Sequence, residues 1–247
     1  MIRGLYTAGT GMLLKRRQME TVINNITNAD TTGYKKEYFI STPFSQVMVN
    51  RLNDSMPGTI GNMTFGAQPD QLYINFETGS FETTGSTTDF AIAGDAFFAV
   101  ETPDGERYTK NGAYVLNSEG YLTDANGNYL LGTNGRIYVG SEDFAVDAQG
   151  RVTVGGAQTN QIRLVGFEDL NTLRKQGSNL FFSDEAPAEL TGTVDIKQGF
   201  LETSNVDIAR EMVDMMTVYR TYETNQRILT MIDETIGMSV NNIARLG

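Results

Sequence analysis

Apolar residues recur at alternating steps of three and four along the C-terminal end of the chain, from Ile208 to Ile243. Only Gln226 and Asp233 interrupt this heptad series, which is typical of a helix that buries one stripe of its surface. A helix of about 40 residues is about 60 Å long, longer than a small domain is wide. Its own chain cannot cover such a helix completely, so the pattern predicts oligomerisation.

The N-terminal end carries a second heptad series over residues 2–26, interrupted at Gly9 and Arg16. It predicts a helix that ends near Asn28, where turn-forming residues lead to Gly33, for which we expect a positive φ. The N-terminal helix is then the natural first partner of the C-terminal one. Taken by itself, the series is also consistent with an amphipathic helix that packs against its own domain.

The start of the C-terminal helix is predicted at Ser204. The segment from Ser204 to Asp207 is typical of a capping box, with the aspartate at the third helical position. Additional apolar residues such as Val213, Met216 and Met231 lie off the heptad series, so we expect this helix to contact neighbours on more than one side.

Short apolar runs alternate with turn signals through the middle of the chain. The runs are Phe90–Ile92, Ala96–Val100, Tyr129–Leu131 and Gln161–Val165. The turn signals end at Gly105, Gly120, Gly127, Gly135 and Gly150. Turns at spacings near ten residues predict an antiparallel β barrel or sandwich. Residues 42–71 show no clear period and are interpreted as extended loop with a possible short strand or hairpin.

The composition of the chain argues against several classes of function. The 247 residues include no histidine, cysteine or tryptophan, which removes imidazole bases, thiolate nucleophiles and the usual zinc ligands. The net charge of −11 argues against nucleic acid as the main partner, although residues 1–40 carry six basic side chains against three acidic ones. No apolar run is long enough to span a membrane, and we expect no cleaved signal peptide.

Three blocks of the sequence resemble the bacterial flagellar rod and hook family. The first, near the N-terminus, is Asn24-Asn25-Ile26-x-Asn28-x-x-Thr31-Thr32-Gly33-Tyr34-Lys35. The second runs from Thr84 to Phe98. The third comprises Gly199-Phe-Leu-Glu-Thr-Ser-Asn-Val206, Glu211-Met-Val-x-Met215 and Tyr219-Arg-x-Tyr-Glu223-x-Asn225. The last block is most similar to the distal rod protein, and a proximal rod paralogue is the alternative.

The resemblance implies an α+β fold that is mainly β. Its terminal helices would pair as a coiled coil and build a tube, and its β domain would lie outside. The expected parts are an N-terminal helix over residues 1–33, an extended or hairpin linker over 34–75, a central β domain over 76–203 and a C-terminal helix over 204–247. The chain would be a structural protein, not an enzyme, with no cofactor and no metal site.

The resemblance also implies partners and a location. The partners would be further copies in a helical homopolymer, other rod and hook proteins, rod-surrounding ring proteins and the flagellar export apparatus, with no nucleic acid and no membrane insertion. The chain would lie in the basal-body rod, outside the cytoplasmic membrane.

Two sets of residues are expected to act in assembly. The first is the apolar heptad set: Leu5, Met12, Met19, Ile23, Ile26, Met212, Met215, Tyr219, Tyr222, Leu229, Ile236, Val240 and Ile243. The second is the motif turn: Asn24, Asn25, Asn28, Thr32 and Gly33.

Two other classes of function fit the sequence less well. A carbohydrate-binding β module would account for the aromatic middle of the chain but not for the terminal heptads. A peptidoglycan hydrolase would need a carboxylate pair about 5–9.5 Å apart, and no motif favours a particular pair.

Overall fold

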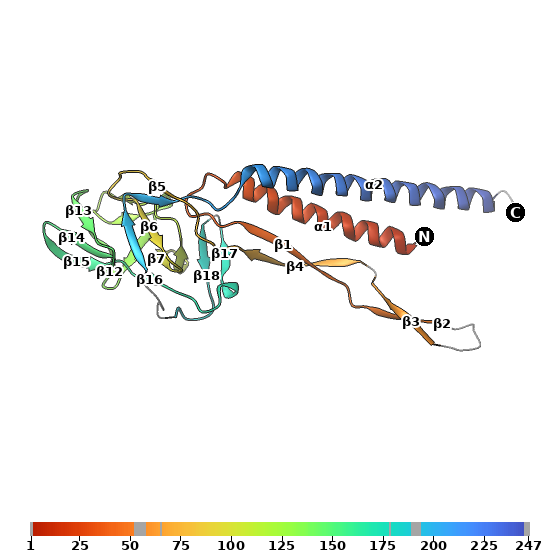
Figure 1. Cartoon of the computed structure of the whole chain (residues 1–247), viewed down its shortest axis with the longest axis horizontal. Coiled ribbons are helices and arrows are strands. Elements are labelled where there is room, and N and C mark those ends of the chain that lie inside the picture. The colour runs from red at the N-terminus through yellow and green to blue at the C-terminus, as the bar shows by residue number, and fades with distance from the viewer. Residues whose placement is uncertain (1, 52–57, 65, 178, 189–193, 245–247) are drawn as a thin grey trace. The chain divides into compact units, whose positions relative to one another are not determined.

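The computed structural model describes residues 2–51, 58–64, 66–177, 179–188 and 194–244 (Figure 1). The chain divides into two compact units. The helical unit comprises Met1–Ile26, Glu37–Tyr73 and Asp207–Gly247, and the β unit comprises Thr27–Lys36 and Ile74–Val206.

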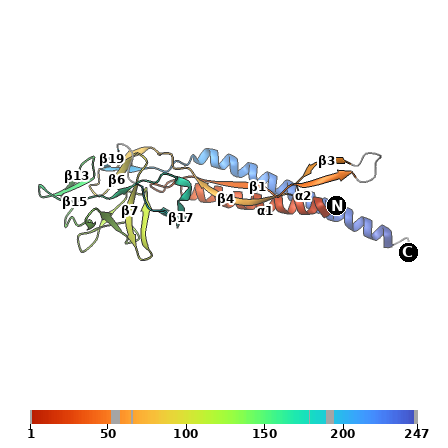
Figure 2. The same cartoon turned by 90° about the horizontal axis from the view of Figure 1, so that it is seen from below.

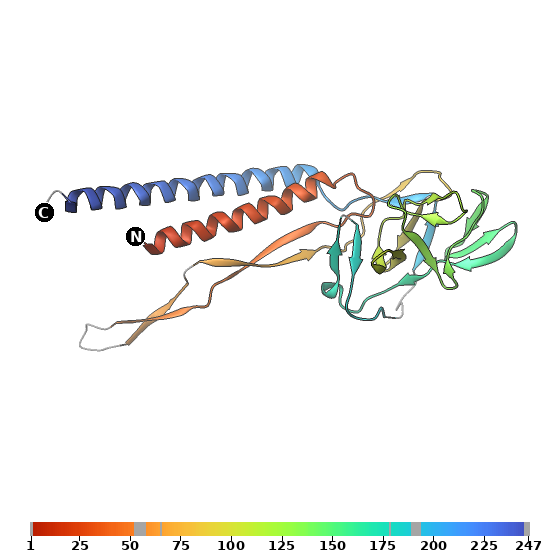
Figure 3. The ribbon, with the colours of Figure 1, turned by 180° about the vertical axis from the view of Figure 1, so that it is seen from behind.

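Two antiparallel helices, α1 (Ile2–Thr27) and α2 (Ile208–Ala244), lie side by side in the helical unit (Figures 1 and 3). Both form where the heptad series predicts them. No helix in the described part of the chain is long and apolar enough to cross a membrane.

The first turn of α2 differs from the predicted capping box. Asp207 is itself the cap, because its Oδ1 accepts hydrogen bonds from the backbone N–H groups of Ala209 (3.0 Å) and Arg210 (3.2 Å). The Oγ of Ser204 instead accepts a bond from the N–H of Val206, before the helix begins. Serine and aspartate both cap helices well, so the sequence did not distinguish which residue would start this one.

Residues between the two helices add two antiparallel strand pairs to the helical unit (Figure 2). Strand β1 (Glu37–Pro43) pairs with β4 (Ala67–Ile74), and β2 (Val47–Arg51) pairs with β3 (Gly58–Met63). The segment interpreted as extended loop with a possible hairpin therefore forms ribbons of two strands. A two-stranded ribbon is marginally stable alone, so these strands need packing from elsewhere.

The β unit contains one large sheet and several small ones among its described residues. The large sheet has the order β17-β18-β8-β7-β11-β10-β9, with β12 paired to β11 and β16 paired to β7. Its strands are β7 (Phe97–Thr102), β8 (Gly105–Thr109), β9 (Val115–Leu116), β10 (Leu122–Thr123), β11 (Tyr129–Gly132), β12 (Gly135–Arg136), β16 (Leu164–Val165), β17 (Arg174–Gln176) and β18 (Leu180–Phe182).

Smaller sheets complete the unit. Strands β13 (Phe144–Val146), β14 (Arg151–Val154) and β15 (Ala157–Gln161) form one of them. Strand β6 (Phe90–Ala93) pairs with β19 (Asp195–Gln198), and β5 (Phe81–Thr83) pairs with β20 (Phe200–Glu202). A short 3₁₀ helix spans Leu170–Thr172.

Strand β7 is buried on both faces and separates two apolar cores. Phe98 and Val100 belong to the larger core, whereas Phe97 and Ala99 pack into the smaller one with Phe181. The alternation follows from the period of two along a strand. The rings of Phe97 and Phe181 meet edge to face, with centroids 5.9 Å apart.

The structure confirms the expected α+β, mainly β, fold class. It also gives a positive φ to the glycine of every predicted turn: Gly105, Gly120, Gly127, Gly135 and Gly150.

Gly33 has the expected positive φ, at 68°. It also lies against other backbone of the β unit, because an added Cβ would be 2.5 Å from the backbone nitrogen of Asn111 and 2.6 Å from the carbonyl carbon of Lys110. Gly177 has a similar φ of 72° but open space around it. Substitutions at the two glycines can therefore distinguish the cost of backbone strain from that of a steric clash.

We predict that Gly33→Ala destabilises the chain more than Gly177→Ala does. Both substitutions incur the left-handed strain of about 1–2 kcal/mol, and only the first adds a clash with backbone. Denaturant unfolding of the two variants measures the difference. Equal losses would mean that the packing at Gly33 is not tight in solution.

Candidate assembly surface

Helix α1 packs against α2 through small side chains. A Cβ added at Gly4 would lie 3.2 Å from Cδ1 of Ile232, and one added at Gly11 would lie 3.1 Å from Nδ2 of Asn225. Ala8, on the same face, is buried. This face differs from the predicted heptad set of α1, in which Leu5 and Ile23 are exposed and Met12, Met19 and Ile26 are half-buried.

The predicted set of α2 is divided between two faces. Met212 and Tyr219 are exposed, whereas Val218, which lies outside the set, is buried. A heptad repeat drifts by about 20° per seven residues relative to a straight helix, so a set chosen at that period moves gradually around the helix. Half-buried members of the set are Met215, Tyr222, Leu229 and Ile236.

The end of α2 extends past α1. Gly11 lies beside Asn225, and Gly4 lies beside Ile232. Because the helices are antiparallel, α1 ends in this register before the last turns of α2. Val240, in those turns, is 58% exposed. The last predicted residue, Ile243, lies in α2, but its side chain falls outside the described residues.

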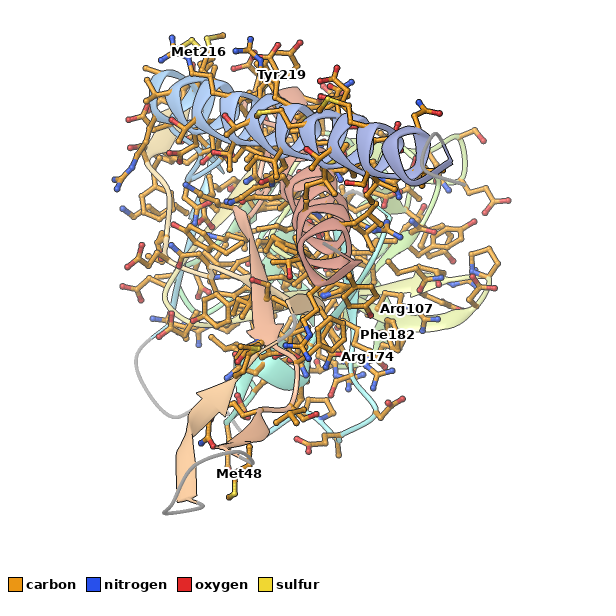
Figure 4. All side chains as sticks on the ribbon, turned by 90° about the vertical axis from the view of Figure 1, so that its right-hand side faces the viewer. Met48, Arg107, Arg174, Phe182, Met216 and Tyr219 are labelled. Atoms are coloured by element: carbon orange, nitrogen blue, oxygen red, sulfur yellow. The ribbon has the colours of Figure 1, made fainter. Side chains whose placement is uncertain are left out.

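Four apolar side chains form what we call the outer face of α2: Met212, Val213, Met216 and Tyr219. Each is about half exposed, at 48%, 56%, 51% and 51% respectively. Figure 4 shows Met216 and Tyr219 on the side of α2 that points away from α1. Large apolar groups gathered on one exposed face mark an interaction site.

A buried polar contact joins three segments of the helical unit. Nδ2 of Asn25, on α1, donates to the carbonyl oxygen of Glu37 (2.9 Å) and to Oε2 of Glu211 on α2 (3.2 Å). In return, the N–H of Glu37 donates to Oδ1 of Asn25 (3.0 Å). Asn25 and Glu211 are each 1% exposed. A single buried amide of this kind fixes the register of paired helices.

Three residues of the predicted motif turn, Asn28, Thr32 and Gly33, follow α1 and belong to the β unit. The hydroxyl of Thr32 donates to Oδ1 of Asn111 (2.7 Å), and its carbonyl oxygen accepts from Nδ2 of Asn179 (2.9 Å). Oδ1 of Asn28 accepts a long bond from the hydroxyl of Thr31 (3.4 Å). Asn24, by contrast, lies on α1 and is exposed.

A buried ion pair connects this turn to the segment before α2. Nζ of Lys35 lies 2.5 Å from Oε1 of Glu202, and both side chains are 1% exposed. Nζ of Lys35 also donates to the carbonyl oxygen of Glu77 (2.7 Å), and the N–H of Gly79 donates to Oε1 of Glu202 (2.9 Å). The N–H of Gly33 donates to the carbonyl oxygen of Glu202 (2.8 Å). Breaking a buried pair of this kind costs about 3–5 kcal/mol.

Asn205 brings together the segments at which the chain enters and leaves the β unit. Its Oδ1 accepts from the N–H of Lys36 (2.8 Å), and its Nδ2 donates to the carbonyl oxygen of Asn75 (2.9 Å). The N–H of Asn75 donates in turn to the carbonyl oxygen of Lys36 (2.8 Å).

A second buried lysine lies near the ion pair. Burial lowers the pKa of Lys110 to about 8; the Glu202 carboxylate opposes this shift, and the positive charge of Lys35 adds to it. Nζ of Lys110 donates to the carbonyl oxygen of Gly94 (2.7 Å).

The expected sites omitted Lys35, Glu202, Asn205 and Glu211. All four lie within the three sequence blocks that resemble the flagellar family. Membership of those blocks was the sequence feature that could have identified them. Charged residues are almost never fully buried unless they are paired, and the partners of these four are far away in the sequence.

Three families of known proteins match parts of the chain. Residues 5–35 match the family described as flagella basal body rod protein, and residues 91–154 match the flagellar hook protein FlgE/F/G D1 domain. Residues 197–243 match the family described as flagellar basal body rod FlgEFG protein C-terminal.

Whole-chain relatives agree with these matches. Flagellar hook-basal body complex protein FlhO of Bacillus subtilis is 31% identical over 270 aligned positions, which cover 100% of both chains. Flagellar basal-body rod protein FlgG of Agrobacterium fabrum is 31% identical, covering 98% of this chain and 100% of its own. Flagellar basal-body rod protein FlgF of Caulobacter vibrioides is 33% identical, covering 100% and 99%.

The chain belongs to the flagellar rod and hook family. It is a structural subunit of the flagellar rod and not an enzyme, because this is a family of structural proteins. It is located in the basal-body rod and assembles there with other rod and hook proteins.

We predict that Asn25→Leu in this rod subunit loosens the pairing of α1 with α2. Leucine is similar in size to asparagine, but it cannot form the hydrogen bonds that Asn25 makes with the backbone of Glu37 and with the buried Glu211 carboxylate. Each group left unsatisfied costs about 1–3 kcal/mol. Hydrogen exchange of the α1 amides should accelerate at least tenfold. Asn241→Leu, an exposed position on α2, is the matched control, and equal exchange in both variants would contradict the prediction.

We predict that Lys110 makes stability depend on pH between about 8 and 10.5. Its folded pKa is below its ordinary value of 10.5, so the unfolded chain binds the proton more tightly. This contribution to the free energy of unfolding therefore rises as the pH is raised from 8 to 10.5 and is constant below 8. Denaturant unfolding of wild type and Lys110→Met at several pH values isolates the contribution of Lys110 to the free energy of unfolding. Parallel curves for the two proteins would refute the assignment.

Proposed function

We propose that the chain is a subunit of the distal rod, which polymerises helically through its terminal helices. The observation that carries the proposal is the outer face of α2, four apolar side chains that α1 does not cover. In the proposed polymer, α1 and α2 of each copy pack beside the same helices of neighbouring copies and form the inner wall of a tube.

The energetics favour apolar contacts as the source of stability between copies. Burying one methionine, leucine or isoleucine side chain stabilises by about 1.5–3 kcal/mol, whereas an exposed ion pair contributes about 0–1 kcal/mol. The predicted apolar residues that remain exposed or half-buried in one copy are available for this purpose. Charged residues around these apolar side chains would then determine the specificity of the contact between copies more than its affinity.

The proposed position is the distal rod, and a proximal rod position is the alternative. The segment Glu202-Thr-Ser-Asn205 and the pattern from Tyr219 to Glu223 resemble the distal rod protein. The similarity to both FlgG and FlgF leaves the two positions to be separated by experiment.

The remaining parts of the proposal concern the surroundings of the rod. The tube would transmit motor torque to the hook and surround the export channel. Its subunits would leave the cytoplasm through the flagellar export apparatus without a cleaved signal peptide, and ring proteins would surround the finished rod where they are present.

Electron microscopy of purified basal bodies with a labelled subunit tests the proposed position. Label at the hook end of the rod supports the distal assignment, and label next to the cytoplasmic membrane supports the proximal one. Basal bodies without label would contradict both.

We predict that replacing Met212, Met216 and Tyr219 together with aspartate abolishes rod assembly and leaves the monomer folded. The side chains are exposed in one copy, so the charges cost little there, but they would be buried without partners between copies. Motility and the content of purified basal bodies are the measurements.

The matched control replaces Thr217, Thr224 and Thr235, also exposed on α2, with aspartate. It adds the same charge to the same helix and should retain assembly. Normal rods from the triple variant of the outer face would show that this face is not an assembly surface.

A further inference from the structure

An arginine, a phenylalanine and a second arginine lie in a row across three neighbouring strands of the β unit. Arg174 on β17 is the register partner of Phe182 on β18, and Cζ of Arg107 on β8 lies 5.6 Å from the centroid of the Phe182 ring. Phe181 points to the opposite face, into the smaller apolar core, so Phe182 and its neighbours point outward. Figure 4 shows the three side chains together, and we call them the arginine row.

The arginine row lacks a carboxylate partner. Three other arginines of the β unit form ion pairs: Arg136 with Glu101, Arg151 with Asp147 and Arg163 with Glu106. Among the described residues, no carboxylate lies within ion-pair distance of Arg107 or Arg174. Nε of Arg107 donates to Oε1 of Gln176 (2.5 Å), and its Nη1 donates to the carbonyl oxygen of Glu106 (2.8 Å). Both acceptors are uncharged, and Nε2 of Gln176 donates in turn to Oδ2 of Asp104 (3.3 Å), so that carboxylate is linked to Arg107 only through the glutamine.

The lack of a direct carboxylate partner is unexpected because the β unit is acidic, with 20 acidic side chains against 10 basic ones. Arg107 and Arg174 carry like charges on the two strands beside β18, and among the described residues no carboxylate forms an ion pair with either of them. Arginine and aromatic residues are enriched in the centres of protein interfaces, where arginine binds carboxylates in a bidentate manner. The chemistry that fits the row is a pair of carboxylates on a protein surface.

The chain itself carries such a pair at the opposite end of the β unit. Glu142 and Asp143 are adjacent and exposed, immediately before β13. Neither carboxylate has a hydrogen bond or ion pair with any described residue. Figures 1 and 2 agree that β13 and β17 lie at opposite ends of the β unit. The unit therefore presents complementary charges on two different ends.

We propose that the arginine row of one copy binds Glu142 and Asp143 of the next copy, so that β units join head to tail. This inference rests on the proposed helical polymer and adds to it a contact outside the helices. A contact between two different surfaces of the same chain continues from copy to copy, which is the kind of contact that builds helical filaments. Charge complementarity fixes the register of the units, and the ring of Phe182 excludes water from the ion pairs.

Charge reversal in cells tests the contact. Arg107→Glu with Arg174→Glu should reduce the yield of rods at least tenfold, and so should Glu142→Lys with Asp143→Lys. The four changes together restore complementarity and should recover at least half of the wild-type yield. Arg151→Glu is the control, because Asp147 on the same unit already pairs with that arginine. No loss in the two reversals, or no recovery in the combination, would overturn the inference.

Crosslinking gives a second test that does not depend on motility. The chain has no cysteine, so Arg174→Cys with Asp143→Cys provides the only thiols. A bismaleimide added to purified rods should produce a ladder of dimers and larger species, whereas either single variant should produce none. If rods contain the double variant in normal amounts but give no crosslinked species, the proposed contact is wrong and the proposed polymer is unaffected. A product with a different rod protein would overturn the copy-to-copy assignment. Absence of the protein from rods would instead count against the proposed function.

Discussion

The structure depends on a buried ion pair between Lys35 and Glu202, which are 167 residues apart in the sequence. Neither charge could remain inside the β unit alone, because removing one partner leaves the other desolvated and unpaired. Asn205 adds hydrogen bonds to Lys36 and Asn75, so the segments at which the chain passes between its two units are joined to one another. Segments of the β unit that are far apart in the sequence are thereby fixed next to each other before any second copy is present.

The helical unit is built with less internal burial than the β unit. At Gly4 and Gly11 the helices meet through the ends of two α2 side chains, Ile232 and Asn225, and this contact buries little apolar area. The larger side chains of α1 and α2 remain at the flanks or on the outer face. Hydrophobic stabilisation is proportional to the area removed from water, so in the proposed polymer the helical unit would gain more from neighbouring copies than the β unit does. That division suits a subunit whose helices complete their packing only in an assembly.

Much of the candidate site could be predicted, but not its orientation. The heptad series located α1 and α2, and the glycine of the motif turn was correctly expected to have a positive φ. The face that each helix buries was not predictable, because a series with a period of 3.5 residues drifts around a straight helix and because Gly4 and Gly11 carry no apolar signal. Asp207 rather than Ser204 caps α2, since both residue types are suitable and only the backbone selects one. Met212 and Tyr219 therefore lie outward, and Val218 lies inward.

The sequence alone determined the periods of the elements, the positions of the turns and the family. These are local properties: a period of two or about 3.6 residues, a glycine that tolerates a positive φ, and short motifs in order. Only the tertiary structure decided that Lys35 would meet Glu202, that Asn25 would join α1 to β1 and α2, and that Arg107 and Arg174 would flank Phe182. Each of these contacts brings together residues from different elements, and no periodicity within one segment specifies its partner in another.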